Sequence, residues 1–270
     1  LSLEQLPFLT HHMYPTLSKN KATYIRQLAL KKYRLAHAAF ILEGKKGIQA
    51  LLASDYVIKY IVGTRSFFIK NQAIISSISR ETEIFEVNKE LLSALGSFVD
   101  NHEVLAVAAI PRPTEPSLST MDITLALDGI QDPGNLGTII RIADWYGIDR
   151  ILCSQTTVEL YNPKVLQASM GSFVKVNLHY VDLPAYLQGL DLPILGATLQ
   201  GTSIDDFLFP DHGVLVIGNE SHGIQSAIEE MLTVAIAIPR YGNANSLNAG
   251  IATAVLCDNW KRVLRKKEKK

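Results

Sequence analysis

The sequence predicts an α/β protein with a small N-terminal α/β unit and a larger C-terminal unit built on a parallel sheet. Predicted strands and helices first alternate over about 90 residues, between 20 and 110. A proline-rich, irregular stretch at 111–121 then interrupts the alternation, as a linker between two units does. After it, short runs such as 214–217 are apolar on both faces, which is typical of strands in a buried parallel sheet.

The N-terminal unit is predicted to begin with a basic helix that leads into a strand. Apolar residues recur at helical spacing between 23 and 42, so that one buried face can hold Ile25, Leu28, Leu35 and Ala39. We expect the basic side chains between them to point outward: Arg26, Lys31, Lys32 and Arg34. Further strands are predicted at 40–44, 56–62, 83–87 and 103–109, and further helices at 47–53 and 89–98.

The C-terminal unit is predicted to hold purer apolar strands. These strands lie at 123–127, 150–153, 194–197, 213–217 and 234–238, and helices are predicted at 135–146, 163–171 and 247–261. Ligands of open parallel sheets bind beyond the carboxyl ends of the strands. Three loops rich in glycine and polar residues each follow a strand and precede a helix there: 128–137, 218–223 and 239–248.

Length and composition exclude several classes of protein. The 270 residues are 47% apolar and 19% charged, as in a globular protein and unlike a disordered or fibrous chain. No run reaches the roughly 18 uncharged apolar residues of a membrane-spanning helix, and no secretory signal is recognisable at the N-terminus. Cys153 and Cys257 lie far apart in apolar surroundings. We therefore expect buried thiols in a reducing compartment, the cytoplasm.

The net charge of zero conceals two basic ends. Residues 1–50 carry eight basic and two acidic side chains, residues 261–270 carry seven and one, and the residues between carry eleven and twenty-three. Basic ends can attract a polyanion such as nucleic acid. The alternative is that the lysine-rich C-terminus is only a solvated helix end, because such runs are common.

Several catalytic and metal motifs are absent. The loop at 128–137 has neither the G-x-G-x-x-G spacing of a dinucleotide site nor the G-K-[ST] ending of a phosphate-binding loop. The histidines and cysteines show no zinc-ligand spacing, so we expect no metal, and no G-x-S-x-G nucleophile elbow is present. Taken singly, each of the three loops is equally well explained as an ordinary turn that begins a helix.

Together the loops carry a resemblance that none carries alone. The segments LDGIQDPGNLGTIIRIADWYG at 127–147, VIGNESHG at 216–223 and IPRYGNANSLN at 238–248 resemble, in order and spacing, the three motifs of SpoU/TrmH-type RNA 2′-O-ribose methyltransferases of the SPOUT superfamily. The segment NPKVLQASMGS at 162–172 is similar to the stretch between the first two motifs. KYRLAHAAFILEG at 32–44 is similar to the start of the substrate-binding domain that many members carry.

The resemblance implies an organisation and a cofactor. Residues 20–110 would form a ribosomal-protein-like domain that binds substrate RNA, 111–121 a linker, and 122–264 a methyltransferase domain with a deep trefoil knot. It also implies a homodimer with S-adenosylmethionine held in the knot. The cofactor-binding residues carried over by motif are Ala197, Thr198, Ile217, Gly218, Asn219, Ile238, Ser246, Leu247 and Asn248.

The implied reaction moves a methyl group from a sulfonium to a ribose 2′-hydroxyl. The catalytic arginine of the family corresponds to Arg141. A guanidinium is a poor base, so orientation of phosphate and stabilisation of a developing oxyanion are the roles its chemistry suits. Asn135 would orient substrate or Arg141, and Glu220 with Asn219 would anchor a loop of the site.

The resemblance does not identify the residues that contact RNA or the class of RNA that is methylated. The candidate phosphate contacts are the basic residues at the N-terminus, namely Arg26, Lys31, Lys32 and Arg34. Ribosomal RNA is favoured over transfer RNA as substrate, because the appended domain resembles those of members that modify ribosomal RNA. The alternative function is a non-catalytic RNA-binding protein of the same fold, which would not bind S-adenosylmethionine.

Overall fold

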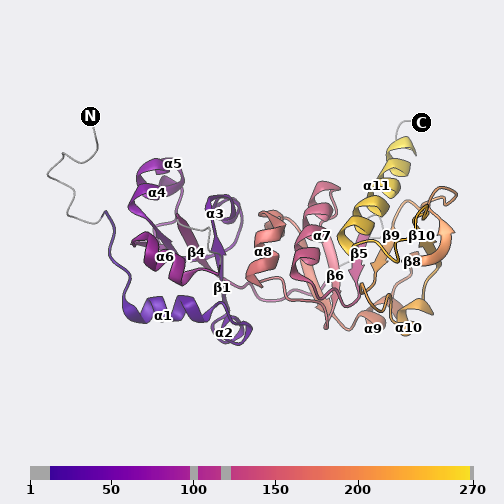
Figure 1. Ribbon diagram of the computed structural model, residues 1–270, viewed down its shortest axis with the longest axis horizontal. Coiled ribbons are helices and arrows are strands. Elements are labelled where there is room, and N and C mark those ends of the chain that lie inside the picture. The colour runs from indigo at the N-terminus through magenta and orange to yellow at the C-terminus, as the bar shows by residue number, and fades with distance from the viewer. Residues whose placement is uncertain (1–12, 98–102, 117–122, 268–270) are drawn as a thin grey trace. The chain divides into compact units, whose positions relative to one another are not determined.

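The computed structural model describes residues 13–97, 103–116 and 123–267 (Figure 1). The chain forms two compact units, Leu1–Pro111 and Arg112–Lys270. The second half of the predicted linker, 117–121, and the last three residues of the basic C-terminus lie outside the described residues. Each unit has its own sheet, as the sequence predicts.

The N-terminal unit is a four-stranded mixed sheet with helices around it. The strand order is β1-β4-β2-β3; β4 runs antiparallel to β1 and β2, and β3 runs parallel to β2. The order of elements along the chain confirms the predicted alternation of strands and helices. In chain order the elements are α1 Lys19–Gln27, α2 Lys31–His37, β1 Ala39–Glu43, α3 Lys45–Leu52, β2 Ile58–Gly63, α4 Arg65–Lys70, α5 Gln72–Ser76, β3 Glu83–Glu86, α6 Lys89–Leu95 and β4 Val104–Ala109.

The predicted basic helix is in fact two helices, and the break overturns one prediction. Leu30 is extended, with φ −99° and ψ 132°, so α2 starts in a new helical phase. Arg34 is consequently only 2% exposed, and its Nη1 donates to the carbonyls of Leu28 and Ala29 at 2.8 and 2.7 Å. These carbonyls lie at the end of α1, where helix geometry leaves acceptors unpaired. Leu35, expected inside, is 64% exposed.

The C-terminal unit is a six-stranded sheet in which every pair of neighbours is parallel, as the sequence predicts. The strand order is β10-β8-β9-β5-β6-β7. Its elements are β5 Ile123–Leu127, α7 Pro133–Trp145, β6 Arg150–Ser154, α8 Pro163–Ser169, the 3-10 helix η1 Ser172–Val174, β7 Asn177–Val181, α9 Leu183–Gln188, β8 Ile194–Ser203, β9 Gly213–Ile217, α10 Ser226–Glu229, β10 Val234–Ala237 and α11 Ala249–Lys267.

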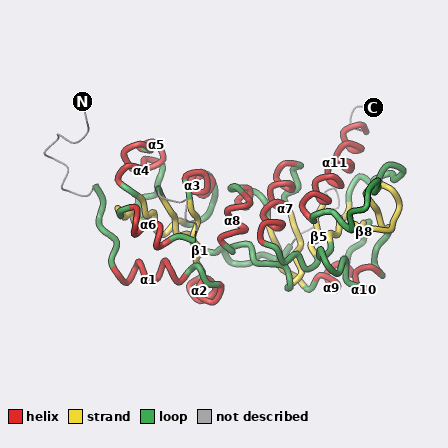
Figure 2. The backbone as a smooth tube through the Cα atoms, in the orientation of Figure 1, coloured by secondary structure: helices red, strands yellow, loops and turns green. Residues whose placement is uncertain are grey.

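Helices cover both faces of this sheet (Figures 1 and 2). On one face, Leu183 and Leu187 of α9 and Ile228 of α10 pack with Val214 and Val216 of β9 in one apolar cluster. The long helices α7 and α11 lie on the opposite side, where they run next to each other. Both faces of the central strands are buried, which explains their uninterrupted apolar sequence. The implied trefoil knot stays a prediction.

Candidate active site

The site begins at the edge of the parallel sheet where the carboxyl ends of β5, β8, β9 and β10 meet. Because these strands are parallel, the segments that follow them converge on one side of the unit. A cavity of about 1020 Å³ opens there. It is lined by residues 197–200 of β8, by the loop at 217–224, by the stretches 232–236, 238–242 and 244–247, and by Ala249, Ala252 and Leu256 of α11.

A break in strand pairing brings β8 into the cavity wall. β8 pairs with β10 at Gly196 and Ala235, but the next pair joins Thr202 to Ile236. Residues 197–201 therefore leave the ladder and bulge outward, which is how Ala197 and Thr198 come to line the cavity. The Thr198 hydroxyl donates to the Gln200 carbonyl at 3.1 Å.

The loop after β9 closes on itself. Backbone amides of Asn219 and Gly223 each donate to the other's carbonyl at 2.9 Å, and the Asn219 Oδ1 accepts from the Ser221 amide at 2.8 Å. A Cβ on Gly218 would lie 2.3 Å from the Gly223 carbonyl carbon. No side chain fits at position 218, so backbone forms the cavity wall at this point.

Two bonds tie the loops after β5 and β9 together. Asn219 Nδ2 donates to the Gly129 carbonyl at 2.7 Å. Asp128, 5% exposed, accepts from the backbone and side-chain nitrogens of Gln225 at 2.8 and 2.9 Å. Our sequence reasoning assigned no role to Asp128 or Gln225. The available signal was an acidic residue directly after an all-apolar strand, since a carboxylate buried there needs partners.

Asn135 joins the three motifs. Its Nδ2 donates to Glu220 Oε1 at 2.5 Å, and its Oδ1 accepts from Asn248 Nδ2 at 2.7 Å. Asn248 Oδ1 in turn accepts from the first amides of α11, those of Gly250 and Ile251, at 3.0 and 3.2 Å. One amide on α7 is thus bonded to the loop after β9 and to the residue that caps α11.

Arg141 lies on α7, nearly two turns beyond Asn135, and is exposed. It makes no hydrogen bond or ion pair to any residue that the structure describes, and it does not line the cavity. Trp145 follows one turn later on the same helix face and is 83% exposed. A free guanidinium beside the motif network is available for an anion from outside the protein.

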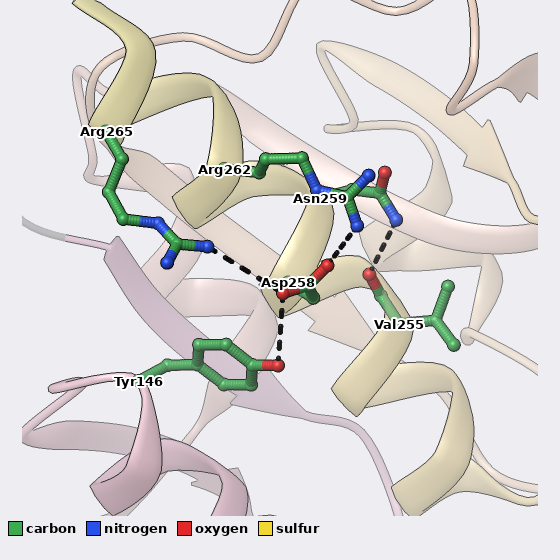
Figure 3. A network of polar contacts seen from close by, with 6 residues as sticks. All are labelled: Tyr146, Val255, Asp258, Asn259, Arg262 and Arg265. Atoms are coloured by element: carbon green, nitrogen blue, oxygen red, sulfur yellow. Dashed lines mark hydrogen bonds and ion pairs between the residues drawn. The ribbon is translucent and has the colours of Figure 1, made fainter. Parts of the chain in front are cut away.

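Helices α7 and α11 are held together at two levels. At the start of α11, a Cβ on Gly250 would lie 2.9 Å from the Thr138 side chain of α7, so glycine permits the approach. At the other end, Tyr146 Oη donates to Asp258 Oδ1 at 3.5 Å, while Asp258 also pairs with Arg262 and Arg265 (Figure 3). Burial, then the neighbouring Asp258 carboxylate, raises the pKa of Tyr146, which keeps the phenol protonated as a donor.

The structure collects most of the predicted cofactor residues at one place. Nine predicted site residues line the cavity: Ala197, Thr198, Ile217, Gly218, Asn219, Glu220, Ile238, Ser246 and Leu247. Asn135, Arg141 and Asn248 belong to the adjoining network and helix α7 rather than to the lining. The predicted RNA contacts Arg26, Lys31 and Lys32 are exposed residues of the N-terminal unit, and Arg34 is buried there.

The described part of the chain contains neither a metal-binding cluster nor a membrane-spanning helix. Residues 13–97, 103–116 and 123–267 contain no group of three or more His, Cys, Asp or Glu side chains that could hold a metal ion. Nor does any helix within those ranges combine the length and apolar character needed to cross a bilayer.

Comparison with known proteins identifies the family. Residues 122–258 match the model of the SpoU rRNA methylase family, which covers just over half of the chain. The chain belongs to the SpoU rRNA methylase family. Residues 19–106 match a second family model, that of the MRM3-like substrate binding domain.

Individual relatives of this SpoU-family chain agree with that assignment. It is 29% identical over 236 residues to the 23S rRNA (guanosine(2553)-2′-O)-methyltransferase RlmP of Bacillus subtilis, covering 86% of this chain and 92% of the relative. A Porphyromonas gingivalis structure assigned to the TrmH family of RNA methyltransferases is 34% identical, with a TM-score of 0.80 over 92% of this chain and 99% of the other. An AdoMet-bound rRNA methyltransferase from Sinorhizobium meliloti is 25% identical, with a TM-score of 0.82 over 93% and 97%.

Proposed function

We propose that this chain transfers a methyl group from S-adenosylmethionine to a ribose 2′-hydroxyl of ribosomal RNA. The observation that carries the proposal is the bonding of Asn135 to Glu220 and Asn248, which assembles all three family motifs beside one cavity. Relatives and solved structures that span most of the chain are rRNA 2′-O-methyltransferases and AdoMet-bound methyltransferases. Asn135, Arg141 and Glu220 are the residues that we assign to catalysis.

The cavity fits the cofactor. Its volume of about 1020 Å³ is ample for a molecule of this size. Ile217, Ile238 and Leu247 provide apolar wall for a purine, while the backbone at Gly218 and the Ser246 hydroxyl are polar groups that can hold the remainder. When bound, S-adenosylmethionine supplies a methyl group made electrophilic by its positive sulfur.

The protein's own residues must make a weak nucleophile react. A ribose hydroxyl has to be held in line with the methyl group, and its oxygen gains negative charge when its proton leaves. Arg141 is exposed and unbonded among the described residues, so it can orient an adjacent phosphate and stabilise that oxygen. Asn135 and Glu220 keep α7, which carries Arg141, in register with the cavity wall.

RNA selection is assigned to the N-terminal unit. Arg26, Lys31 and Lys32 are exposed there, and Lys32 Nζ lies 4.8 Å above the Tyr33 ring. The first two helices contain no acidic residue that would neutralise this surface. If these residues contact phosphates, RNA binding weakens steeply as salt rises.

We further propose a cytoplasmic homodimer. Trp145 on α7 and Ile251 on α11 are 83% and 55% exposed, although the two helices pack side by side. Large apolar side chains left in water on one pair of helices favour a protein partner, and a second copy is the partner most soluble oligomers use. Cys153 and Cys257 are free and buried thiols, which suits a reducing compartment.

The function is tested by transfer of labelled methyl from S-adenosylmethionine to unmodified transcripts of 23S rRNA, small-subunit rRNA and tRNA. A 2′-O-methyl group blocks alkaline cleavage of the neighbouring 3′ linkage, so we expect label in an alkali-resistant dinucleotide from the 23S transcript. Arg141→Ala is expected to lose about 100-fold or more of the activity, the loss typical of removing a donor to a developing oxyanion. Its thermal midpoint should not change, because Arg141 has no partner among the described residues.

Two results would contradict the proposal. Label in an alkali-sensitive product would mean methylation of a base. RNA binding with neither label nor cofactor binding by calorimetry would identify the alternative, a non-catalytic RNA-binding protein of this fold.

The matched control for Arg141→Ala is Arg141→Lys, which keeps the positive charge but not the bidentate fork of the guanidinium. We expect it to retain part of the activity. The difference between the two variants separates the contribution of the charge from that of the hydrogen-bond geometry.

A further inference from the structure

An aromatic side chain on the cavity rim has no role in the site described so far. Tyr241 lines the cavity, yet it is 94% exposed. Large aromatic rings are usually turned inward, so a ring held almost fully in water at a binding site is a candidate for contact with a ligand.

The loop that presents Tyr241 is short and supported on both sides. It leaves β10 after Ala237 and enters α11 at Ala249. Arg240 Nη1 donates to the Ala244 carbonyl at 3.3 Å, which closes a turn around Tyr241. Five residues further along the same loop, Ser246 and Leu247 line the cavity. The backbone at Tyr241 is therefore held beside the cavity, while its ring stays open to solvent.

We propose that Tyr241 stacks on the base of the nucleotide whose ribose is methylated. The inference rests on the proposed function, because that reaction brings one ribose to the cavity mouth and its attached base to the rim. The flat face of a tyrosine ring suits any base, and such stacking is tolerant of sequence. Tyr241 is in this way a positioning residue that holds the 2′-hydroxyl within reach.

Contact with the cofactor explains the exposed position of Tyr241 less well than contact with RNA does. A group that covers S-adenosylmethionine would bury much of its own surface against the cavity, whereas Tyr241 is turned almost wholly to solvent. Exposed polar residues line the same cavity, among them Arg240, Glu220 and Ser221, together with the exposed Leu199 and Leu247. Such a mixed rim suits an RNA strand, which offers both polar groups and flat bases.

The test compares Tyr241→Phe and Tyr241→Leu with the wild-type chain in methyl transfer to an unmodified 23S rRNA transcript. Phenylalanine keeps the ring face and leucine keeps only apolar bulk. We expect Tyr241→Leu to raise KM for the transcript about tenfold, the size of one lost stacking contact, and Tyr241→Phe to stay within twofold of wild type. Leu208→Ala is the matched control, since Leu208 is 87% exposed but does not line the cavity.

Cofactor affinity and the wild-type reaction separate the possible failures. Calorimetry should give the same Kd for S-adenosylmethionine in all four proteins, and a weaker Kd in Tyr241→Leu would make the ring a cofactor lid and overturn the proposal. Equal KM values in leucine and phenylalanine variants would also overturn it. Wild-type chain that binds S-adenosylmethionine but methylates none of the transcripts would instead refute the proposed function.

Discussion

At the scale of single residues, one amide determines how the motifs fit together. Asn135 uses its nitrogen as donor to Glu220 and its oxygen as acceptor from Asn248. Only a side chain with both a donor and an acceptor can make these two bonds at once. An asparagine at the start of a helix is an ordinary turn or capping residue in sequence, so its position between two other motifs was visible only in the fold.

Replacing Asn135 with aspartate should separate these roles. Asn135→Asp keeps the acceptor for Asn248 but places a second carboxylate against Glu220. We expect methyl transfer at pH 7 to fall about tenfold or more, because a charged hydrogen bond becomes a repulsion. Activity should recover partly as the pH is lowered and the carboxylates share a proton.

The matched variant is Asn135→Ala, which removes both bonds without adding charge. We expect its activity to fall by the same factor at every pH, because the variant adds no group that titrates. Identical pH profiles for the alanine and aspartate variants would show that Glu220 does not face a charge at this position.

At the scale of elements, helices α7 and α11 carry or adjoin the residues that we propose for catalysis. α7 carries Asn135 and Arg141, and Asn248 caps α11. The two helices touch at Thr138 and Gly250 and again at Tyr146 and Asp258. The second contact lies eight residues after the first in both helices, so the helices run in the same direction. Weakening either contact should change the site without touching a catalytic group.

The Tyr146 contact predicts a defined alkaline instability. The pKa of Tyr146 is raised by burial and by the Asp258 carboxylate, so it lies above its value in the unfolded chain. The contribution of Tyr146 to stability is therefore complete below about pH 10 and is lost as the pH rises toward the folded-state pKa. Tyr146→Phe should be less stable than wild type near pH 7, by up to about 1 kcal/mol, and should lose less stability above pH 10.

Urea unfolding followed by circular dichroism from pH 7 to 11 measures this difference. The buried thiol of Cys153, whose pKa burial also raises, gives wild type and variant the same alkaline background. Parallel stability curves across the whole range would disprove the role given to Tyr146.

Sequence reasoning found most of the elements, and its errors have local causes. The runs at 123–127 and 213–217 are apolar because both sheet faces are covered, and they were predicted at their observed bounds. β7 was missed because it lies at the end of the sheet, where polar residues such as Asn177 and His179 are tolerated. Arg34 was misplaced because the break at Leu30 shifts the helical phase.

The site divides in the same way. Family motifs identified the residues of the cavity wall, since each motif is continuous in sequence. Partners across the fold, such as Asp128 with Gln225, were not identified because their contact depends on how loops after two strands meet. Tyr241 followed no periodic pattern, and only its exposure at a cavity distinguishes it.

At the scale of the whole molecule, the chain separates the tasks of its two units. The residues that we propose for catalysis and the cavity all belong to the C-terminal unit, while the proposed phosphate contacts belong to the N-terminal unit. The C-terminal unit also carries the exposed apolar face at Trp145 and Ile251 that we assign to a second copy.

The dimer is tested by a charge on that face. Trp145→Asp should sediment as a monomer at micromolar concentration where wild type sediments as a dimer, since burying an unpaired carboxylate in an interface is unfavourable. Trp145→Phe, which keeps an aromatic side chain, should remain dimeric. A wild-type chain that sediments as a monomer, or an aspartate variant that stays dimeric, would exclude this face as the interface.

The two buried cysteines give the C-terminal unit a pair of natural reporters. Cys153 lies in β6 within the sheet, whereas Cys257 follows Leu256, a cavity-lining residue of α11. A thiol-reactive reagent can label either one only when the surrounding structure opens, so the labelling rate measures local unfolding. A ligand in the cavity should slow opening of α11 more than that of the central sheet. The chain thereby reports, without any engineered probe, which part of its fold a ligand makes rigid.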